Sequence, residues 1–137
     1  HERSSAASDV YKRQDKNLYS TLLLPQGKNG PAFLAFKNFE VYLKWNDSFI
    51  YTVTAAHLAK RLGGAKKYKH NNPSDILEIE AMIKLQNVLR SKGYDVGKVD
   101  GILGAKTRQA VRSVQLEFGL SADSWPTKEL LRKLLIN

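Results

Sequence analysis

The 137-residue sequence contains no cysteine, only three histidines and no long apolar run. Without cysteine, disulfides and cysteine-ligated zinc are excluded. His57 and His70 have no partner at metal-ligand spacing, so we expect no metal site. The longest apolar runs, such as TLLL and LLI, are too short to cross a bilayer. No apolar segment near the start is typical of a secretion signal, so we expect none within these residues.

Acidic residues are also scarce relative to basic ones, with 13 against 22, and the formal net charge is +9. This charge favours an anionic partner, such as nucleic acid, a lipid surface or an acidic cell-wall polymer. A basic surface that is only solvated would explain it equally well. The length and the apolar content of 42% suit one ordinary domain or two small ones.

The stretch GYDVGKVDGILGAKT, residues 93–107, concentrates glycine and aspartate. It contains no G-x-G-x-x-G pattern and no phosphate-binding lysine motif, so no nucleotide cofactor is expected. Asp95 and Asp100 lack the alternating oxygen ligands of a calcium loop. We therefore predict an architectural role, in which Asp100 and Gly101 form a turn with positive φ and Gly104 begins a helix.

The chain divides by composition into four segments. Residues 1–14 lack periodicity and are predicted to be disordered and non-native, because DVYKRQ resembles the translated end of a transposase adaptor. Residues 15–65 are predicted to fold, with an irregular turn-rich stretch around Pro25 to Pro31 followed by two helices. Residues 66–75 are predicted to be a basic linker, and residues 76–137 a separate small domain.

The helices are predicted from apolar spacing and end signals. In the first segment, one helix follows Asn38, and a second runs to Gly63 and Gly64 with an apolar stripe that includes Leu58. In the second, three helices form a small bundle, with the first starting at Ser74, the second at about 105–118 and the third after Thr127. The fold class is therefore mainly α. The remaining residues predicted to face the core of the bundle are Ile79, Met82, Ile83, Leu85, Leu89, Ala110, Val111, Val114, Phe118, Leu130, Leu131, Leu134 and Leu135.

Two glutamines lie beside these core stripes. Gln86 is on the first bundle helix and Gln115 on the second. A buried amide needs partners, so we expect both side chains to bond the backbone of loops and to hold the helices together.

Two stretches resemble known families. Residues 82–134 resemble the peptidoglycan-binding domain found at the ends of many cell-wall hydrolases. Val114 stands where an aromatic residue usually precedes the glutamine, and Ser124 where glycine usually follows the aspartate. The residues that carry the resemblance are Leu85, Gln86, Leu89, Gly93, Tyr94, Gly97, Asp100, Gly101, Gly104, Thr107, Ala110, Val111, Gln115, Gly119, Leu120 and Asp123.

The upstream text LLLPQGKNGPAFLAFKNFEVYLKWNDSFIYTVTAAHLAKRLGG resembles the C-terminal end of the catalytic domain of membrane-bound lytic murein transglycosylases of the B type. The resemblance implies a short helical remnant of a lysozyme-like domain. It also implies cleavage of the MurNAc–GlcNAc bond without water, in which one glutamate followed by serine protonates the leaving oxygen. No Glu-Ser pair occurs in the sequence. We therefore expect a fragment that lacks the catalytic acid and is inactive alone, without a catalytic residue or cofactor.

The family resemblance also implies the partner, the location and the binding residues. We expect the partner to be peptidoglycan, bound through its glycan strands or its stem peptides, and the location to be the periplasm or the cell envelope. We also expect a monomeric chain that binds no nucleic acid. Asn46 would carry over from the glycan cleft, with Trp45 in place of the usual tyrosine, while a helix cap and a core position are their ordinary roles. In the second domain, we predict a groove formed by Tyr94, the turn at Asp100 and Gly101, and the loop of Asp123.

The alternative is a basic three-helix nucleic-acid-binding module. The segment AKTRQAVRSVQ would be its recognition helix. The residues that would face the nucleic acid are Lys106, Arg108, Gln109, Arg112 and Gln115. Against it, the loop between the first two bundle helices is far longer than a helix-turn-helix turn.

Overall fold

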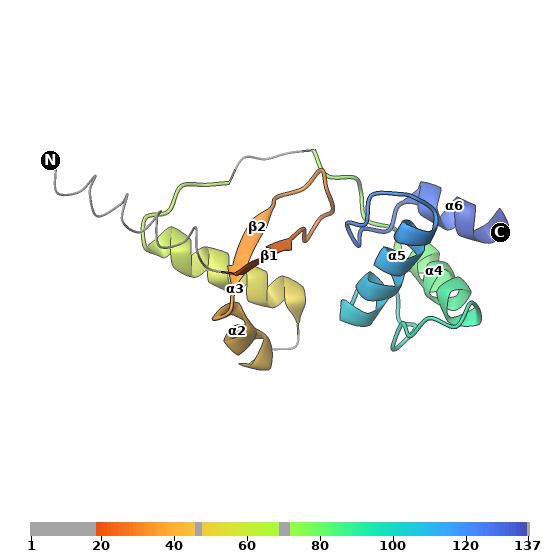
Figure 1. Ribbon diagram of the computed structural model, residues 1–137, viewed down its shortest axis with the longest axis horizontal. Helices are drawn as coiled ribbons and strands as arrows, with labels where there is room; N and C mark the ends of the chain where they lie inside the picture. The colour runs from red at the N-terminus through yellow and green to blue at the C-terminus, as the bar shows by residue number, and fades with distance from the viewer. Residues whose placement is uncertain (1–18, 46–47, 69–71, 137) are drawn as a thin grey trace, which may run out of the picture.

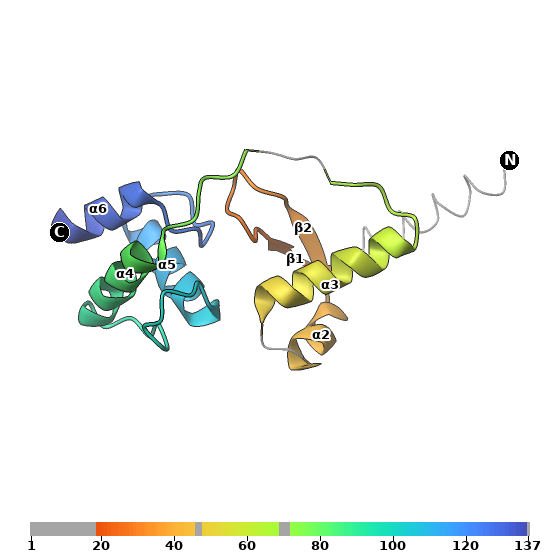
Figure 2. The same ribbon diagram turned by 180° about the vertical axis from the view of Figure 1, so that it is seen from behind.

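The computed structural model describes residues 19–45, 48–68 and 72–136. It contains an upstream unit of two strands and two helices and a bundle of three further helices (Figure 1, and from behind in Figure 2). The predicted mainly α fold class is confirmed. Predictions for residues 1–14, Asn46 and His70 lie outside the described residues. No helix in the described ranges is long and apolar enough to cross a membrane.

The upstream unit begins with a β-hairpin that the sequence did not predict. Strands β1 (Ser20–Leu23) and β2 (Phe33–Phe36) pair antiparallel, with Ser20 opposite Phe36 and Leu23 opposite Phe33. The prediction of an irregular segment was therefore incomplete. Each strand has only 4 residues, and residues 24–32 join them in place of the two-residue turn that marks most hairpins in a sequence.

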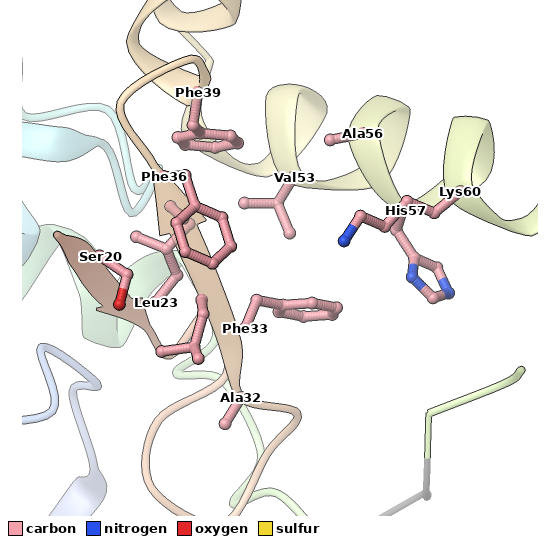
Figure 3. Close-up of a pocket in the computed structure, with 12 residues that line it drawn as sticks. Ser20, Leu23, Ala32, Phe33, Phe36, Phe39, Val53, Ala56, His57 and Lys60 are labelled. Carbon is pink, nitrogen blue, oxygen red and sulfur yellow. The ribbon is translucent and has the colours of Figure 1, made fainter. Parts of the chain in front are cut away.

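The two predicted upstream helices are confirmed as α2 (Phe39–Trp45) and α3 (Phe49–Leu62). The Ser48 hydroxyl caps α3 by accepting a hydrogen bond from the backbone N–H of Tyr51 at 3.3 Å. The predicted apolar stripe of α3 is wrong at Leu58, which is 58% exposed. Val53, which belongs to the same predicted stripe, is buried on the side of α3 that faces the hairpin (Figure 3).

The downstream bundle consists of α4 (Ile79–Ser91), α5 (Ala105–Glu117) and α6 (Lys128–Ile136). Helix α6 begins after Thr127, whose hydroxyl accepts a hydrogen bond from the Leu130 N–H at 3.2 Å. All three helices contribute to one buried apolar cluster, as expected for a small bundle. Its members are Leu77, Met82, Leu85, Leu89, Val96, Ala110, Val111, Val114, Leu130, Leu131 and Leu134.

Three details of the predicted bundle are wrong. Helix α4 begins at Ile79 and not at Ser74, because the Ser74 carbonyl accepts the indole N–H of Trp125 at 3.0 Å. Ile79, the first residue of α4, is 68% exposed even though it lies against the Gly101 loop. Leu135 is 49% exposed, because Leu131 and Leu134 already fill the inward face of the short helix α6.

The loop of the hairpin contacts the bundle. The backbone N–H of Lys28 donates to Asp123 Oδ2 at 2.9 Å, and Lys28 Nζ donates to Ser121 Oγ at 3.2 Å. Gly27 lies against Trp125 so closely that an added Cβ would be 2.6 Å from the Trp125 Cβ. We call this contact, between residues 25–28 and the bundle, the junction.

Candidate functional site

Gln86 organises the glycine-rich loop as predicted. Its side chain is fully buried, and Oε1 accepts the backbone N–H groups of Asp100 at 3.2 Å and Gly101 at 3.0 Å. Nε2 donates to the Ile102 carbonyl at 3.0 Å and to Thr107 Oγ1 at 3.2 Å. One amide on α4 thereby fixes the turn and the start of α5, so the loop is held as a rigid surface.

The turn has the predicted backbone geometry. Gly101 has φ of 77°, in the left-handed region that favours glycine, and Gly104 is the N-cap residue of α5. A Cβ on Gly101 would also be 2.7 Å from Cγ2 of Ile79, so the absence of a side chain lets the turn approach α4.

Gln115 binds the loop of Asp123 in the same way as Gln86 binds the first loop. Its Nε2 donates to Asp123 Oδ1 at 2.8 Å and to the Trp125 carbonyl at 3.1 Å. Its Oε1 accepts the Ser124 N–H at 2.9 Å. The predicted role of both glutamines as partners of loop backbone is confirmed.

Ser124 stands where the resembled family usually has glycine, and its backbone has a conformation that favours glycine. With φ of 61°, it is the single non-glycine residue with positive φ among those described. We predict that Ser124→Gly raises the free energy of unfolding by about 1 kcal/mol, because glycine adopts this conformation without Cβ repulsion. Chemical denaturation of both chains would measure the difference. Ser74→Gly is the matched control, since Ser74 has no positive φ and should gain nothing, and equal gains at both positions would contradict the explanation.

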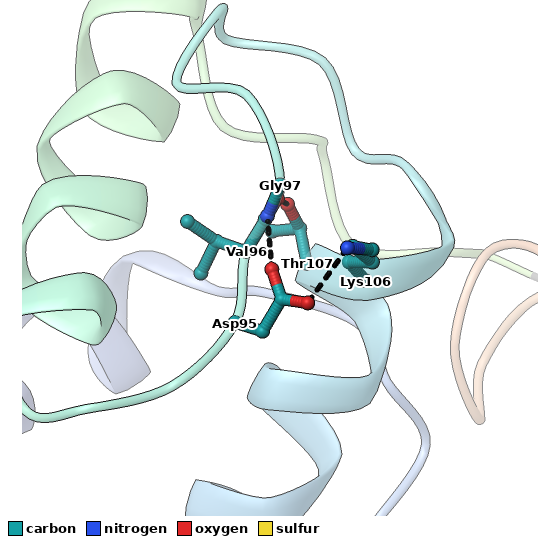
Figure 4. Close-up of polar contacts among 5 residues, drawn as sticks. All are labelled: Asp95, Val96, Gly97, Lys106 and Thr107. Carbon is teal, nitrogen blue, oxygen red and sulfur yellow. Dashed lines mark hydrogen bonds and ion pairs between the residues drawn. The ribbon is translucent and has the colours of Figure 1, made fainter.

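Beside the first turn is a shallow hollow of about 210 Å³. Its wall includes Asp100, Gly97 and Lys106. Asp95 is bonded to two of the lining residues, because Oδ1 accepts the Gly97 N–H at 2.9 Å and Oδ2 pairs with Lys106 Nζ at 2.7 Å (Figure 4). These two contacts, first the one from Lys106, lower the pKa of Asp95. Lys106, in the wall of the hollow, is therefore held in an exposed ion pair at neutral pH.

The structure does not bring all predicted groove residues to this hollow. Asp100 lines it, while Tyr94 and Asp123 do not. The Tyr94 hydroxyl donates to Glu117, and this bond, together with burial, raises the pKa of Tyr94. Asp123 uses Oδ1 for Gln115 and Trp125 and Oδ2 for Lys28, so both its oxygens hold the junction and the loop.

The predicted glycan-cleft residues belong to the upstream unit. Trp45 is the last residue of α2, and Asn46 lies outside the described residues. The upstream unit has a cavity of about 630 Å³ between the hairpin and α3, shown in Figure 3. Phe33, Phe36, Val53 and His57 line it, so its wall is mostly apolar.

Arg108 is the residue that sequence reasoning placed incorrectly. The nucleic-acid alternative assigns it to an exposed recognition face, yet it is 8% exposed, and its Nη2 donates to the Pro25 carbonyl at 2.9 Å. Its guanidinium carbon is 5.1 Å from the ring centre of Phe49 and 5.7 Å from that of Trp125. Helical spacing contained a signal, because Arg108 is three and seven residues before Val111 and Gln115, which also point inward.

The bundle and the upstream unit match two families of protein domains. Residues 79–134 match the family described as "Putative peptidoglycan binding domain", and residues 2–60 match the family described as "Transglycosylase SLT domain". The second match begins within residues 1–14, the segment predicted to be non-native because DVYKRQ resembles the translated end of a transposase adaptor.

Relatives of known structure and of curated sequence agree with these matches. SltB3 from Pseudomonas aeruginosa, in complexes with NAG-anhNAM-pentapeptide and NAG-NAM-pentapeptide, is 42% identical, with TM-scores of 0.67 and 0.66. These alignments cover 86% and 85% of the chain and 32% of SltB3. The spore cortex-lytic enzyme of Bacillus cereus is 42% identical in an alignment of 57 residues that covers 39% of the chain.

The chain spans only part of these relatives, 22% of the curated enzyme and about a third of SltB3. Within that span both units are accounted for, the upstream unit by one family and the bundle by the other. Along the chain, residues 2–60 thus match the transglycosylase SLT family and residues 79–134 the peptidoglycan-binding family, in that order.

Proposed function

We propose that the bundle binds peptidoglycan and thereby holds an attached transglycosylase domain on the bacterial cell wall. The observation that carries this proposal is the 42% identity, over 86% of the chain, to SltB3 in complex with a peptidoglycan fragment. A binding domain on the same chain raises the effective concentration of substrate at a catalytic domain without adding chemistry. The chain would act in the cell envelope, as a monomer, and its basic charge suits an anionic wall polymer.

The binding surface that we propose lies on the loops held by the two glutamines. Tyr94, Asp100 and Gly101 would contact the ligand, whereas Asp123 would shape the surface from behind through its bonds to Gln115 and Lys28. Trp45 and Asn46 would belong to the glycan cleft of the SLT segment. The boundaries remain as proposed from composition, with an SLT segment at 15–65, a linker at 66–75 and the binding domain at 76–137.

The transglycosylase reaction needs an acid, and we infer from the absence of a Glu-Ser pair in the sequence that this chain does not supply it. The reaction implied by the family resemblance uses one glutamate, followed by serine, which protonates the oxygen between MurNAc and GlcNAc. Glu40 is the one glutamate in the described part of the upstream unit. It lines an open hollow with Leu43 and Phe49, but its side chain is exposed rather than enclosed. An acid with a raised pKa requires such enclosure. We therefore propose that the chain binds without cleaving.

Sedimentation with purified peptidoglycan sacculi tests both the proposed binding and the proposed absence of cleavage. We expect the chain to pellet with sacculi and to release no anhydro-muropeptides, measured by chromatography of the supernatant. A chain that stays in the supernatant would disprove binding, and detectable anhydro-muropeptides would disprove the absence of a catalytic acid. Lysozyme-digested sacculi serve as the control, because an intact polymer is needed to pellet the chain.

Nucleic-acid binding is the outcome that would replace this proposal. Of the five residues assigned to a recognition helix, Arg108 and Gln115 are buried, and Lys106 is paired with Asp95. Of the five, only Gln109 and Arg112 are neither buried nor held in that ion pair. DNA retention that depends on salt, with no pelleting of sacculi, would favour the nucleic-acid module.

A further inference from the structure

Arg108 lies at a second cavity, distinct from the hollow beside Asp100. This cavity measures about 450 Å³, within the range of small-ligand sites. Both units contribute to its wall, Pro25 and Ile50 from upstream and Arg108 and Trp125 from the bundle. We call it the junction cavity.

The guanidinium of Arg108 is incompletely satisfied there. Nη2 donates to Pro25, but Nε is buried and has no hydrogen-bond partner, and Nη1 donates to none of the described residues. Buried polar groups in folded proteins nearly always have partners. Burial also lowers the pKa of Arg108 to about 10, still well above neutrality, so the side chain remains a cation.

No carboxylate of the described residues forms an ion pair with this cation. Asp75 lines the same cavity, but its side chain is exposed and forms no hydrogen bond or ion pair with Arg108. A buried arginine without a counterion, on the wall of an open cavity, is a site for a planar anion, because its fork of N–H donors matches a carboxylate.

We propose that the junction cavity binds the free carboxylate of a short peptide, with Arg108 as its cationic partner and Trp125 as the apolar wall. Stem peptides of peptidoglycan end in such carboxylates, so the choice of ligand rests on the proposed function. The apolar lining from Pro25, Ile50 and Trp125 suits the methyl groups of a dipeptide. The ligand would contact both units at once, so it would stabilise the junction when bound.

Titration of the ¹⁵N-labelled full chain with N-acetyl-D-alanyl-D-alanine, monitored by NMR, tests the proposal. We expect shifts of the Trp125 indole N–H and of Arg108 Nε–H. The C-terminal amide of the same dipeptide is the matched control and should bind at least ~10-fold more weakly, since a charged hydrogen bond is lost. Equal binding of acid and amide, shifts confined to residues 95–107, or no shift at all would overturn the proposal.

Two variants sharpen the test. Asp75→Asn removes the competing negative charge from the cavity wall and should tighten binding of the acid roughly two- to fivefold, as expected for a partly exposed charge. Arg108→Gln should abolish the preference for acid over amide, whereas Arg112→Gln, on the exposed side of α5, should preserve it. Unchanged binding in Asp75→Asn would contradict the site even if Arg108→Gln failed to fold.

The outcome is separable from that of the sacculus experiment. If the chain pellets with sacculi but does not bind the dipeptide acid, peptidoglycan binding stands and the junction site is wrong. If the dipeptide binds at Arg108 and sacculi are not pelleted, the junction site stands without the proposed function.

Discussion

Gln86→Met should lower the free energy of unfolding of the bundle by about 3 kcal/mol, because each buried polar group left without a partner costs about 1–3 kcal/mol. Methionine fills a similar volume but cannot satisfy the N–H groups of Asp100 and Gly101 or the carbonyl of Ile102. A small domain has little stability to lose, so the midpoint of urea denaturation should fall markedly. Circular dichroism at 222 nm would follow the transition.

Asn87→Ala is the matched control for this substitution. Asn87 is the next residue of α4 and is exposed, so its replacement should change the free energy of unfolding by less than about 0.5 kcal/mol. A loss at Gln86 no larger than that at Asn87 would show that the amide does not hold the loop.

Gly101→Ala should destabilise the bundle by about 2–4 kcal/mol, since a left-handed backbone costs about 1–2 kcal/mol with a Cβ and overpacking adds about 1–3. The new Cβ would be 2.7 Å from Cγ2 and 3.2 Å from the carbonyl oxygen of Ile79. The backbone of α4 cannot move away without disturbing the hydrogen bonds of Gln86 to the same turn. Thermal unfolding would measure the loss.

Two other glycines separate conformational strain from steric contact. Gly93 has φ of 92°, but a Cβ added there would meet no described atom within 4 Å, so Gly93→Ala should show only the strain of about 1–2 kcal/mol. Gly104 has φ of −80° and also faces open space, so Gly104→Ala should have a small effect. The order Gly101, Gly93, Gly104 is the expected result, and equal losses would contradict the explanation.

The bundle could be predicted from sequence because its signals are local. Three signals each indicate a contact between residues that are near in the sequence. They are the spacing of Leu85 and Leu89, the glycine at the turn and the position of Gln86. These signals agree with one another, as expected when local preferences and the global fold coincide. The function of Gln86 as a partner of loop backbone followed from its burial alone.

The hairpin and the junction could not be predicted in the same way. The pairing of Ser20 with Phe36 spans a long loop, and no turn motif indicates it. Arg108 bonds Pro25, which is 83 residues away, and nothing near either residue reports that contact. A basic residue on a helix is usually solvated, so helical spacing indicates the inward position of Arg108, but only the tertiary structure reveals its partner.

The junction gives the two units a second connection besides the predicted basic linker. Residues 66–75 mark a boundary in composition, but the backbone of Pro25 and Lys28 is bonded to Arg108 and Asp123 across it. The two units are thus fastened at a second place that is independent of the peptide chain between them. The orientation of one unit relative to the other therefore depends on close packing at Gly27, where the absence of a side chain leaves room for Trp125 and Asp123.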